Sequence, residues 1–232
     1  MRTADLPEVR QLSLFADMDE TNFAELMQGA FLQRFPPQVD LIHEGEPADF
    51  LYIVIEGGVE LYGTWNGRET TMEFVYPVAT FILAAVLKDA EYLMSARTLE
   101  KSRLLMVPAE LIRSMMDRDP AFAKSIVHEL SCRYRAVVKN LKDHKLRSSI
   151  ERLANYLLRE SGKQNRHDGL LLQVDKKTLA QRLGMTPENL SRAFGTLQEY
   201  GVTVEGRDIT LRDMKALTTL AKPVAHIDDP DC

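Results

Sequence analysis

Short apolar runs separated by turn residues occupy the region from about residue 31 to residue 107. The runs are rich in Val, Ile, Tyr and Phe, and Pro36-Pro37 and Asn66-Gly67 are among the turn signals between them. Such runs are typical of antiparallel strands, and Asn-Gly between two of them is a strong hairpin signal. The pattern predicts an antiparallel β sandwich or roll, preceded by one or two short helices in residues 6–29.

After Pro108 the apolar positions change to a helical period. A stretch of more than six turns without Gly or Pro begins near Pro120, and its apolar residues recur every three or four positions. This spacing approximates a coiled-coil seam, so we expect a long helix over 120–145 that pairs with a second copy of the chain. A helix packed in the core of a monomer is the alternative. The predicted seam consists of Ile126, Leu130, Tyr134, Val137 and Leu141.

The last third of the chain has the spacing of a helix-turn-helix. Ala180, Gly184 and Leu190 stand where this motif needs a small residue at the helix crossing, a turn with positive φ and an apolar plug. Thr186 suits the N-cap, and Pro187 suits the first position, of a second helix over 187–197. The segment VTVEGRDITL that follows has a hairpin pattern. The sequence therefore predicts a winged helix-turn-helix.

The second helix of this motif presents Glu188, Ser191 and Arg192 on one face, because residues three and four apart are neighbours on a helix. The first turn of a recognition helix reaches base edges in the major groove, where Arg donates two bonds to guanine and Glu accepts one from cytosine. We expect these three residues to read bases. Two alternatives stay open: Glu188 merely favours the helix dipole, or the helix-turn-helix docks another protein. The expected phosphate contacts are Lys176, Lys177, Thr178, Arg182, Thr186 and Arg207.

Charge is segregated along the 232 residues, although the net charge is only −5. Residues 1–132 carry 11 Lys and Arg against 21 Asp and Glu, whereas residues 133–222 carry 18 against 10. This asymmetry favours a polyanion partner, namely double-stranded DNA, for the second part, with chance clustering as the alternative.

The start of the chain lacks a secretory pattern, and the apolar run 81–87 is too short to span a membrane. We expect a cytoplasmic protein without a membrane partner, and a disordered acidic tail over 223–232.

The order of these regions resembles the CRP/FNR family of bacterial transcription regulators. HEGEPADFLYIVIEGGVELY (43–62) resembles the β-roll signature of the family, and Glu188, Ser191 and Arg192 resemble the Glu-x-x-Ser-Arg reader of its FNR branch. The resemblance covers nearly the whole chain. It implies an α+β fold with a cyclic-nucleotide-binding-like β-roll over 1–119, a dimerisation helix over 120–145, a winged helix-turn-helix over 146–222 and the tail 223–232. It also implies a homodimeric activator that reads a TTGA-type palindrome and has RNA polymerase as a partner.

The same resemblance bears on the signal. Members that bind cyclic AMP use a Gly-Glu pair for the ribose and an Arg-Ser pair for the phosphate. Here the acidic position falls near Ala84, and Tyr92-Leu93 stand in place of Arg-Ser. A phosphate would meet apolar side chains, so we expect a signal other than cyclic AMP. The two cysteines, Cys132 and Cys232, are too few for an iron–sulfur cluster.

Haem stays open as a cofactor. His43 or Met72 is the candidate ligand, and the candidate effector pocket consists of Phe81, Ile82, Leu83, Val86, Leu87, Tyr92, Leu93 and Arg97. An ordinary core segment is the alternative interpretation of this apolar run. FPPQVDLIHEGEPADF and residues 80–102 also resemble regulators labelled FtrB, associated with ferrous-iron transport genes, which implies an iron- or haem-linked signal.

A metal enzyme with a double-stranded β-helix is the hypothesis from another class. Such enzymes are expected to ligate their metal with two histidines and a carboxylate. Residues 31–107 contain one histidine, His43. We therefore expect neither a metal site nor an enzyme.

Overall fold

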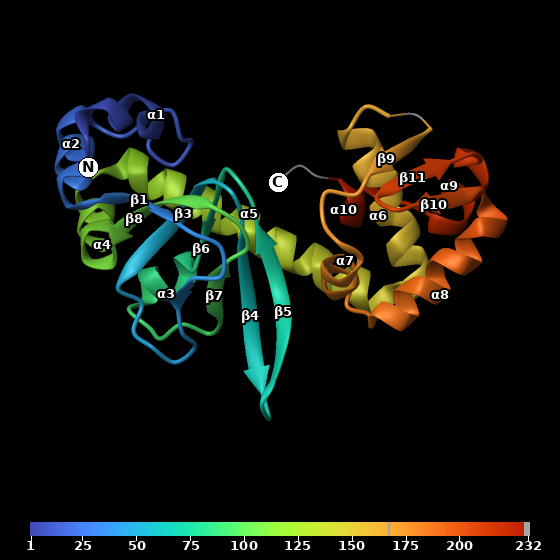
Figure 1. Ribbon diagram of the computed structural model, residues 1–232. Helices are drawn as coiled ribbons and strands as arrows, with labels where there is room; N and C mark the ends of the chain where they lie inside the picture. Colours follow the sequence, from blue (N-terminus) through green and yellow to red (C-terminus); the bar gives the residue numbers. More distant parts are fainter. Residues whose placement is uncertain (167, 230–232) are drawn as a thin grey trace. The chain divides into compact units, whose positions relative to one another are not determined.

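The computed structural model describes residues 1–166 and 168–229. They fall into two compact units, Met1–Cys132 and a second unit that starts at Arg133 (Figure 1). Each unit has its own hydrophobic core.

The first unit is an antiparallel β-roll of two four-stranded sheets. One sheet has the order β1 (Phe31–Phe35), β8 (Ser102–Pro108), β3 (Phe50–Glu56) and β6 (Ala79–Phe81). The other has the order β2 (Asp40–Ile42), β7 (Ser95–Thr98), β4 (Val59–Trp65) and β5 (Arg68–Val75). This arrangement confirms the β-rich part of the predicted α+β fold.

The β4–β5 hairpin projects from the rest of the first unit (Figure 1). Its turn residues Asn66 and Gly67 have φ of 50° and 72°, and Trp65 pairs with Arg68. A two-residue turn of this kind needs positive φ at both positions, which Asn and Gly tolerate. The sequence signal therefore marked this hairpin correctly. Trp65, at the tip, is 80% exposed.

Short helices close the first unit. They are η1 (Thr3–Asp5), α1 (Leu6–Arg10), α2 (Glu20–Gly29), α3 (Leu83–Lys88) and α4 (Ala109–Arg118). Phe15 stacks on Phe122 with ring centroids 6.1 Å apart. Asp119, which is buried, accepts hydrogen bonds from the backbone N–H groups of Asp19 at 2.9 Å and Phe122 at 3.0 Å. The N-terminal segment is thus anchored to the start of the next helix.

That helix, α5 (Pro120–Leu146), corrects the predicted seam. Ile126 is fully buried in the core of the first unit, and Leu130 packs against the same core. Among the exposed large apolar residues of α5 are Val138 at 37% and Leu146 at 69%. The others form one stripe along the helix, namely Val127, Tyr134, Val137 and Leu141, with exposed fractions of 59%, 70%, 59% and 56%. The stripe starts at Val127 because the β-roll covers the neighbouring face of the helix. Val127, Tyr134 and Leu141 are spaced seven residues apart, with Val137 between the last two, which is still the spacing of a coiled-coil seam.

The second unit combines a helical bundle with a small sheet. Its further helices are α6 (Ser149–Lys163), α7 (Lys176–Arg182), α8 (Pro187–Leu197), η2 (Gln198–Tyr200), α9 (Met214–Ala221) and α10 (Ala225–Asp228). The sheet has the order β10 (Val202–Glu205), β11 (Asp208–Leu211) and β9 (Gly169–Leu171), all antiparallel. The predicted hairpin is β10–β11, which lies as a wing after α8.

The predicted disordered tail is wrong for residues 223–229. Residues 225–228 form α10, Ile227 is buried, and Asp228 is held by arginines. These contacts connect residues far apart in the sequence, so the local composition gave no sign of them. Residues 230–232 of the predicted tail lie outside the described residues.

Candidate nucleic-acid interface

Side-chain caps define both helices of the helix-turn-helix. The Asp175 carboxylate accepts from the N–H of Thr178 at 2.7 Å and begins α7. The Thr186 hydroxyl accepts from the N–H of Asn189 at 3.2 Å and begins α8, with Pro187 in its first position. Between them Gly184 has a φ of 60°. The cap, the proline and the turn therefore stand where the sequence placed them.

The turn at Gly184 is also a close contact. A Cβ at this position would lie 2.4 Å from Cε1 of His144, near the end of α5. The positive φ favours glycine here, and a larger residue would also have to push the imidazole ring of His144 aside.

Replacing Gly184 by alanine is expected to lower the free energy of opening α7 and α8 by ~1–3 kcal/mol, the cost of a left-handed non-glycine residue. Amide hydrogen exchange of these two helices measures the change. The matched control is Gly195→Ala in α8, where a Cβ meets nothing within 4 Å. That change should stabilise the helix by ~1 kcal/mol. Equal effects of the two substitutions would contradict this account of the turn.

Helix α8 has one buried and one exposed face. Leu190, Ala193, Phe194 and Leu197 are each at most 7% exposed and belong to the core of the second unit. Glu188, Asn189, Ser191 and Arg192 are all exposed on the other face. The apolar face fixes the helix on the domain, so the three residues predicted to read bases project together into solvent.

The exposed face carries a donor and an acceptor side by side. Nη2 of Arg192 donates to Oδ1 of Asn189 at 2.5 Å. The pKa of Glu188 is lowered by a hydrogen bond from its own backbone N–H, by one from the Thr186 hydroxyl and by the charge of Arg192. Glu188 is therefore a carboxylate beside a guanidinium. Sequence reasoning missed Asn189, which its spacing of three from Arg192 would have revealed.

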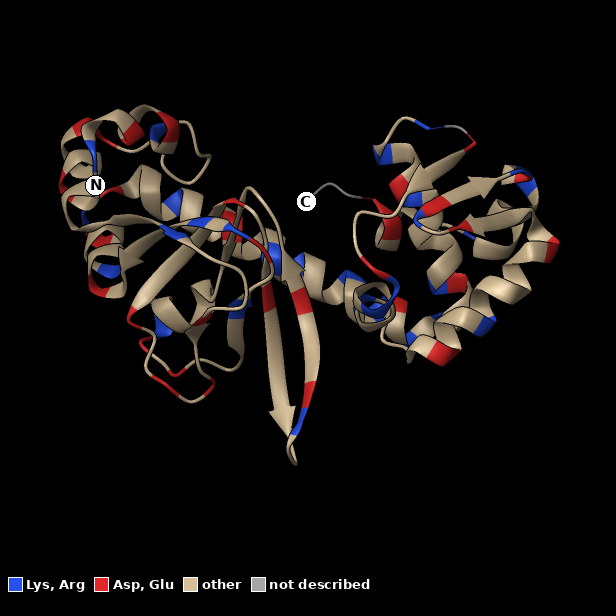
Figure 2. Ribbon diagram, in the orientation of Figure 1, with Lys and Arg blue, Asp and Glu red and all other residues tan. Residues whose placement is uncertain are grey.

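The residues predicted to contact phosphate lie around this helix. Nζ of Lys176 is 6.0 Å from the ring centroid of Phe194, and the Arg182 guanidinium is 5.6 Å from that of Tyr156. Both side chains, like Lys177, are exposed, and Figure 2 shows basic residues gathered on α7. Thr178 is half-buried, whereas Thr186 is exposed.

Arg207 belongs to the wing. It follows Gly206, whose φ is 65°, in the turn between β10 and β11, and its side chain is exposed. The pKa of Asp175 is lowered first by the hydrogen bond from the Thr178 N–H, and the charge of Arg207 is among the further causes. Arg207 therefore contributes to the positive field near the start of α7.

The candidate effector pocket is mostly packed core. Phe81, Leu83, Val86 and Tyr92 are each at most 4% exposed, and the Phe81 ring stacks on Tyr52 at 5.1 Å. Ile82 and Leu87 pack partly against the same cluster. Leu93 is 82% exposed and does not join this packed cluster. It lines an open surface pocket together with Pro47, Ala48, Asp49, Asp89, Ala90 and Glu91. It follows the isolated bridge between Pro47 and Glu91, and its side chain turns outward beyond the core.

Arg97, the cation of that pocket, is already neutralised. Its Nε donates to Glu60 at 2.8 Å and its Nη1 to Glu69 at 3.0 Å, while its guanidinium lies 4.4 Å from the ring centroid of Tyr62. Glu60 is only 6% exposed. Although burial opposes the charged form of Arg97, the two carboxylates raise its pKa. The guanidinium is thus held by carboxylates of its own domain.

The two candidate haem ligands point away from the core. His43 is exposed, and its backbone N–H donates to the Glu46 carboxylate at 3.2 Å. Met72 is 62% exposed and lies over Gly63 of the β4–β5 hairpin. Within residues 1–166 and 168–229, no three His, Cys, Asp or Glu side chains gather as a metal site would require. Because His43 and Met72 both face solvent, they do not fit the axial ligand of a haem held in the apolar core.

A β-roll, a long helix with an exposed apolar stripe and a winged helix-turn-helix together define a two-domain DNA-binding regulator. Two family models match the chain accordingly: the cyclic nucleotide-binding domain over residues 32–119 and the Crp-like helix-turn-helix domain over residues 151–220. The chain therefore combines the two domains of a CRP-type transcription regulator, a cyclic nucleotide-binding domain and a Crp-like helix-turn-helix domain.

Relatives and solved structures agree with this assignment. The chain is 24% identical over 215 residues to the CRP-like cAMP-activated global transcriptional regulator of Mycobacterium tuberculosis, covering 90% of this chain and 96% of the relative. It is 29% identical to the cyclic AMP receptor protein of Thermus thermophilus, covering 81% and 89%. FixK2 from Bradyrhizobium japonicum has the same fold, with a TM-score of 0.70 at 22% identity, over 84% of this chain and 99% of that one. The comparisons favour a regulator over the metal-enzyme hypothesis.

The residues of the β-roll do not fit the phosphate of a cyclic nucleotide. Tyr92 is buried in the core, Leu93 faces solvent, and the guanidinium of Arg97 is engaged by Glu60 and Glu69. An anionic ligand at Arg97 would have to displace two carboxylates, one of them buried. Over the residues described, none of the helices is long and apolar enough to cross a bilayer.

Proposed function

We propose that this regulator works as a homodimer that reads a TTGA-type palindrome with α8 and responds to a signal other than cyclic AMP. The observation that carries the proposal is the exposed face of α8, on which Glu188, Ser191 and Arg192 stand together while the opposite face is buried. In this proposal Arg192 and Glu188 contact a guanine and a cytosine of each half-site. An activator role, with RNA polymerase as partner, follows from the resemblance to the family.

The exposed stripe of α5 supports the dimer. Val127, Tyr134, Val137 and Leu141 leave a narrow apolar strip in water with the seven-residue spacing of a coiled coil. A second copy of α5 presents the same strip. If the two helices are related by a two-fold axis parallel to them, the two strips cover each other. The two reading helices of such a dimer would meet half-sites about one DNA turn, ~34 Å, apart.

The filled core and the occupied Arg97 support a signal other than cyclic AMP. Because the candidate pocket is packed with its own side chains, any small molecule there would have to displace buried apolar groups. The curated relatives named above are cAMP-activated or a cyclic AMP receptor by name. This chain shares their architecture, and in our proposal it does not share their ligand.

The proposal is tested by DNA binding. Fluorescence anisotropy of the full chain would compare a TTGA palindrome, a single half-site and a scrambled duplex at equal salt. We expect the palindrome to bind at least ~10³-fold more tightly than the scrambled duplex, the lower end of specific recognition. Equal affinity for palindrome and scrambled DNA would overturn the reading role of α8, and a monomer in sedimentation would overturn the dimer.

Lys176→Ala is expected to weaken binding to palindrome and scrambled duplex by a similar factor. Lys176 is exposed at the start of α7 and carries a point charge, so it contributes attraction to phosphate without reading a base. The slope of log affinity against log salt should fall by about one ion per protomer. A loss confined to the palindrome would assign Lys176 to base reading instead.

A further inference from the structure

The link between α5 and α6 consists of two residues, Arg147 and Ser148. Ser148 is the N-cap of α6. Its hydroxyl accepts from the Glu151 N–H at 3.3 Å, and its own N–H donates to the Glu151 carboxylate at 2.8 Å. This capping box fixes the start of α6. The direction in which α5 leaves the second unit therefore depends on what holds Arg147.

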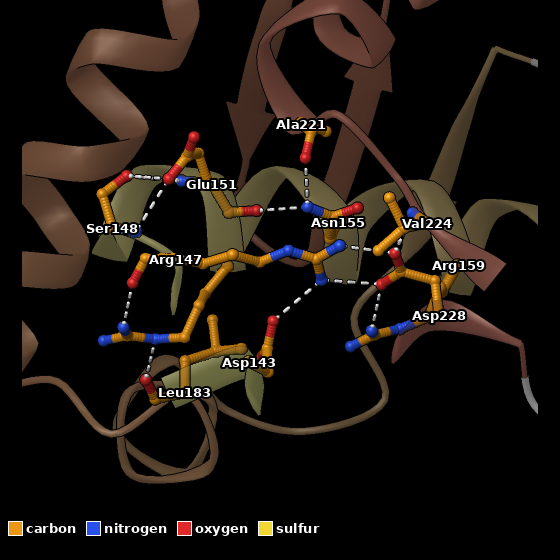
Figure 3. A network of polar contacts seen from close by, with 11 residues as sticks. Asp143, Arg147, Ser148, Glu151, Asn155, Arg159, Leu183, Ala221, Val224 and Asp228 are labelled. Carbon is orange, nitrogen blue, oxygen red and sulfur yellow. Dashed lines mark hydrogen bonds and ion pairs between the residues drawn. The ribbon is translucent and has the colours of Figure 1, made fainter. Parts of the chain in front are cut away.

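The C-terminal segment holds it. Figure 3 shows the Arg147 guanidinium between two carboxylates, Asp143 of α5 and Asp228 of α10. Nη1 and Nη2 of Arg147 donate to the two oxygens of Asp228 at 2.8 and 2.5 Å, which is the bidentate geometry of the strongest ion pairs. Asp228 also accepts from Arg159 of α6 at 2.9 Å and from the N–H of Val224 at 2.8 Å.

This cluster is shielded from water. The side chains of Arg147, Asp228 and Asp143 are 7%, 10% and 13% exposed. Burial opposes ionisation of Asp228, but the bonds from Arg147 and the Val224 N–H, with the charges of Arg147 and Arg159, lower its pKa. Removing one partner of such a cluster leaves buried charge uncompensated, which costs far more than losing a surface ion pair.

The other side of the link is tied to the turn of the helix-turn-helix. Arg152 of α6 donates from Nη1 to the carbonyl of Arg147 at 2.8 Å and from Nε to the carbonyl of Leu183 at 3.0 Å. Leu183 directly precedes Gly184, which packs against His144. On the outer side, Nζ of Lys139 donates to the carbonyl of Asp229 at 2.8 Å. The link thus joins the end of α5, the C-terminal segment and the turn before α8.

We propose that Asp228 is a positioning residue for DNA recognition. Through Arg147 and Arg159, the segment 224–229 braces the α5–α6 link and fixes the direction of α8 relative to residues 133–146 of α5. Tyr134, Val137 and Leu141 of the dimer strip lie in that part of α5. This inference rests on the proposed homodimer, because the brace matters only where two reading helices must reach two half-sites at once.

Loss of the brace should affect affinity for a palindrome of two half-sites differently from affinity for a single half-site. A single half-site is contacted by the exposed residues of α7, α8 and the wing, whereas the hydrogen bonds of Asp228 go to Arg147, Arg159 and Val224. After the first half-site is bound, the second binds at an effective concentration that is highest when the geometry is fixed and falls when the connection becomes loose. Loss of the brace should therefore weaken the palindrome and spare the half-site.

The test is Asp228→Asn in the full chain, with Glu199→Gln, an exposed carboxyl in η2, as the matched control. We expect affinity for the palindrome to fall about tenfold and affinity for the half-site to stay within about twofold. Amide exchange of residues 144–152 should accelerate, while the dimer in sedimentation and the control should match the wild type. Faster exchange with an unchanged ratio of the two affinities would overturn the proposal.

A misfolded Asp228→Asn chain would reveal itself by losing half-site binding as well. In that case the Arg159→Gln variant tests the proposal, because it leaves the bidentate pair of Arg147 and Asp228 in place and removes one other bond to Asp228. We expect about a threefold loss for the palindrome alone, and no change in the ratio would overturn the brace. If the wild type itself does not prefer the palindrome, the failure lies with the proposed function and not with Asp228.

Discussion

The Arg192→Ala variant is expected to lose ~1–3 kcal/mol of discrimination per half-site, roughly 5- to 150-fold, while its affinity for scrambled DNA changes little. The guanidinium is exposed on the first turns of α8 and offers two parallel donors to a guanine. In the free protein one of its nitrogens donates to Asn189, so the side chain is already directed along the exposed face. Anisotropy titrations with palindromes carrying each base at each half-site position measure the effect.

The controls distinguish reading from simple attraction. Arg192→Lys keeps the charge but loses the planar pair of donors, so it should retain affinity for scrambled DNA and still lose base preference. Lys177→Ala removes a charge of α7 and should weaken all duplexes alike. If Arg192→Ala weakened scrambled DNA as much as the palindrome, Arg192 would be a phosphate contact and the reading face would need reassignment.

Val137→Asp is expected to abolish the dimer at micromolar concentrations. Val137 is 59% exposed in the single chain and lies between Tyr134 and Leu141 on the apolar strip. In a dimer two carboxylates would face each other across the seam without a partner, at a cost of several kcal/mol. Sedimentation velocity should show a monomer, and affinity for the palindrome should fall to that for the half-site.

The matched control is Ala136→Asp. Ala136 is exposed on the same turn of α5 but points away from the strip, so the same added charge should leave the dimer intact. Helicity measured by circular dichroism should stay close to that of the wild type in both variants, because a single Asp changes the helix propensity of the 27-residue α5 by less than ~1 kcal/mol. A Val137→Asp chain that still sediments as a dimer would place the interface elsewhere.

Local signals allowed helix α8 to be predicted from the sequence. Thr186, Pro187 and Gly184 act through their own backbone positions, and the alternation of buried and exposed positions on α8 follows from the period of the helix. The hairpin at Asn66-Gly67 was predicted for the same reason. In each case the residues that specify the structure are neighbours in the chain.

The errors arose where distant residues decide. Ile126 has the spacing of a seam residue, but the β-roll buries it, and the strip begins at Val127 instead. Leu93 is apolar, as a core residue would be, but its side chain is 82% exposed to solvent. Asp228 stands in an acidic tail typical of disorder, and its partner Arg147 lies 81 residues earlier. No local pattern could have paired these two residues.

The exposed tip of the β4–β5 hairpin gives the protein an intrinsic optical label. Trp65 is the only tryptophan of the chain, and 80% of its surface is open to water. Its emission should therefore resemble that of a free indole in solution and respond to quenchers in the solvent. Any event that covers the hairpin would shift this emission to shorter wavelength.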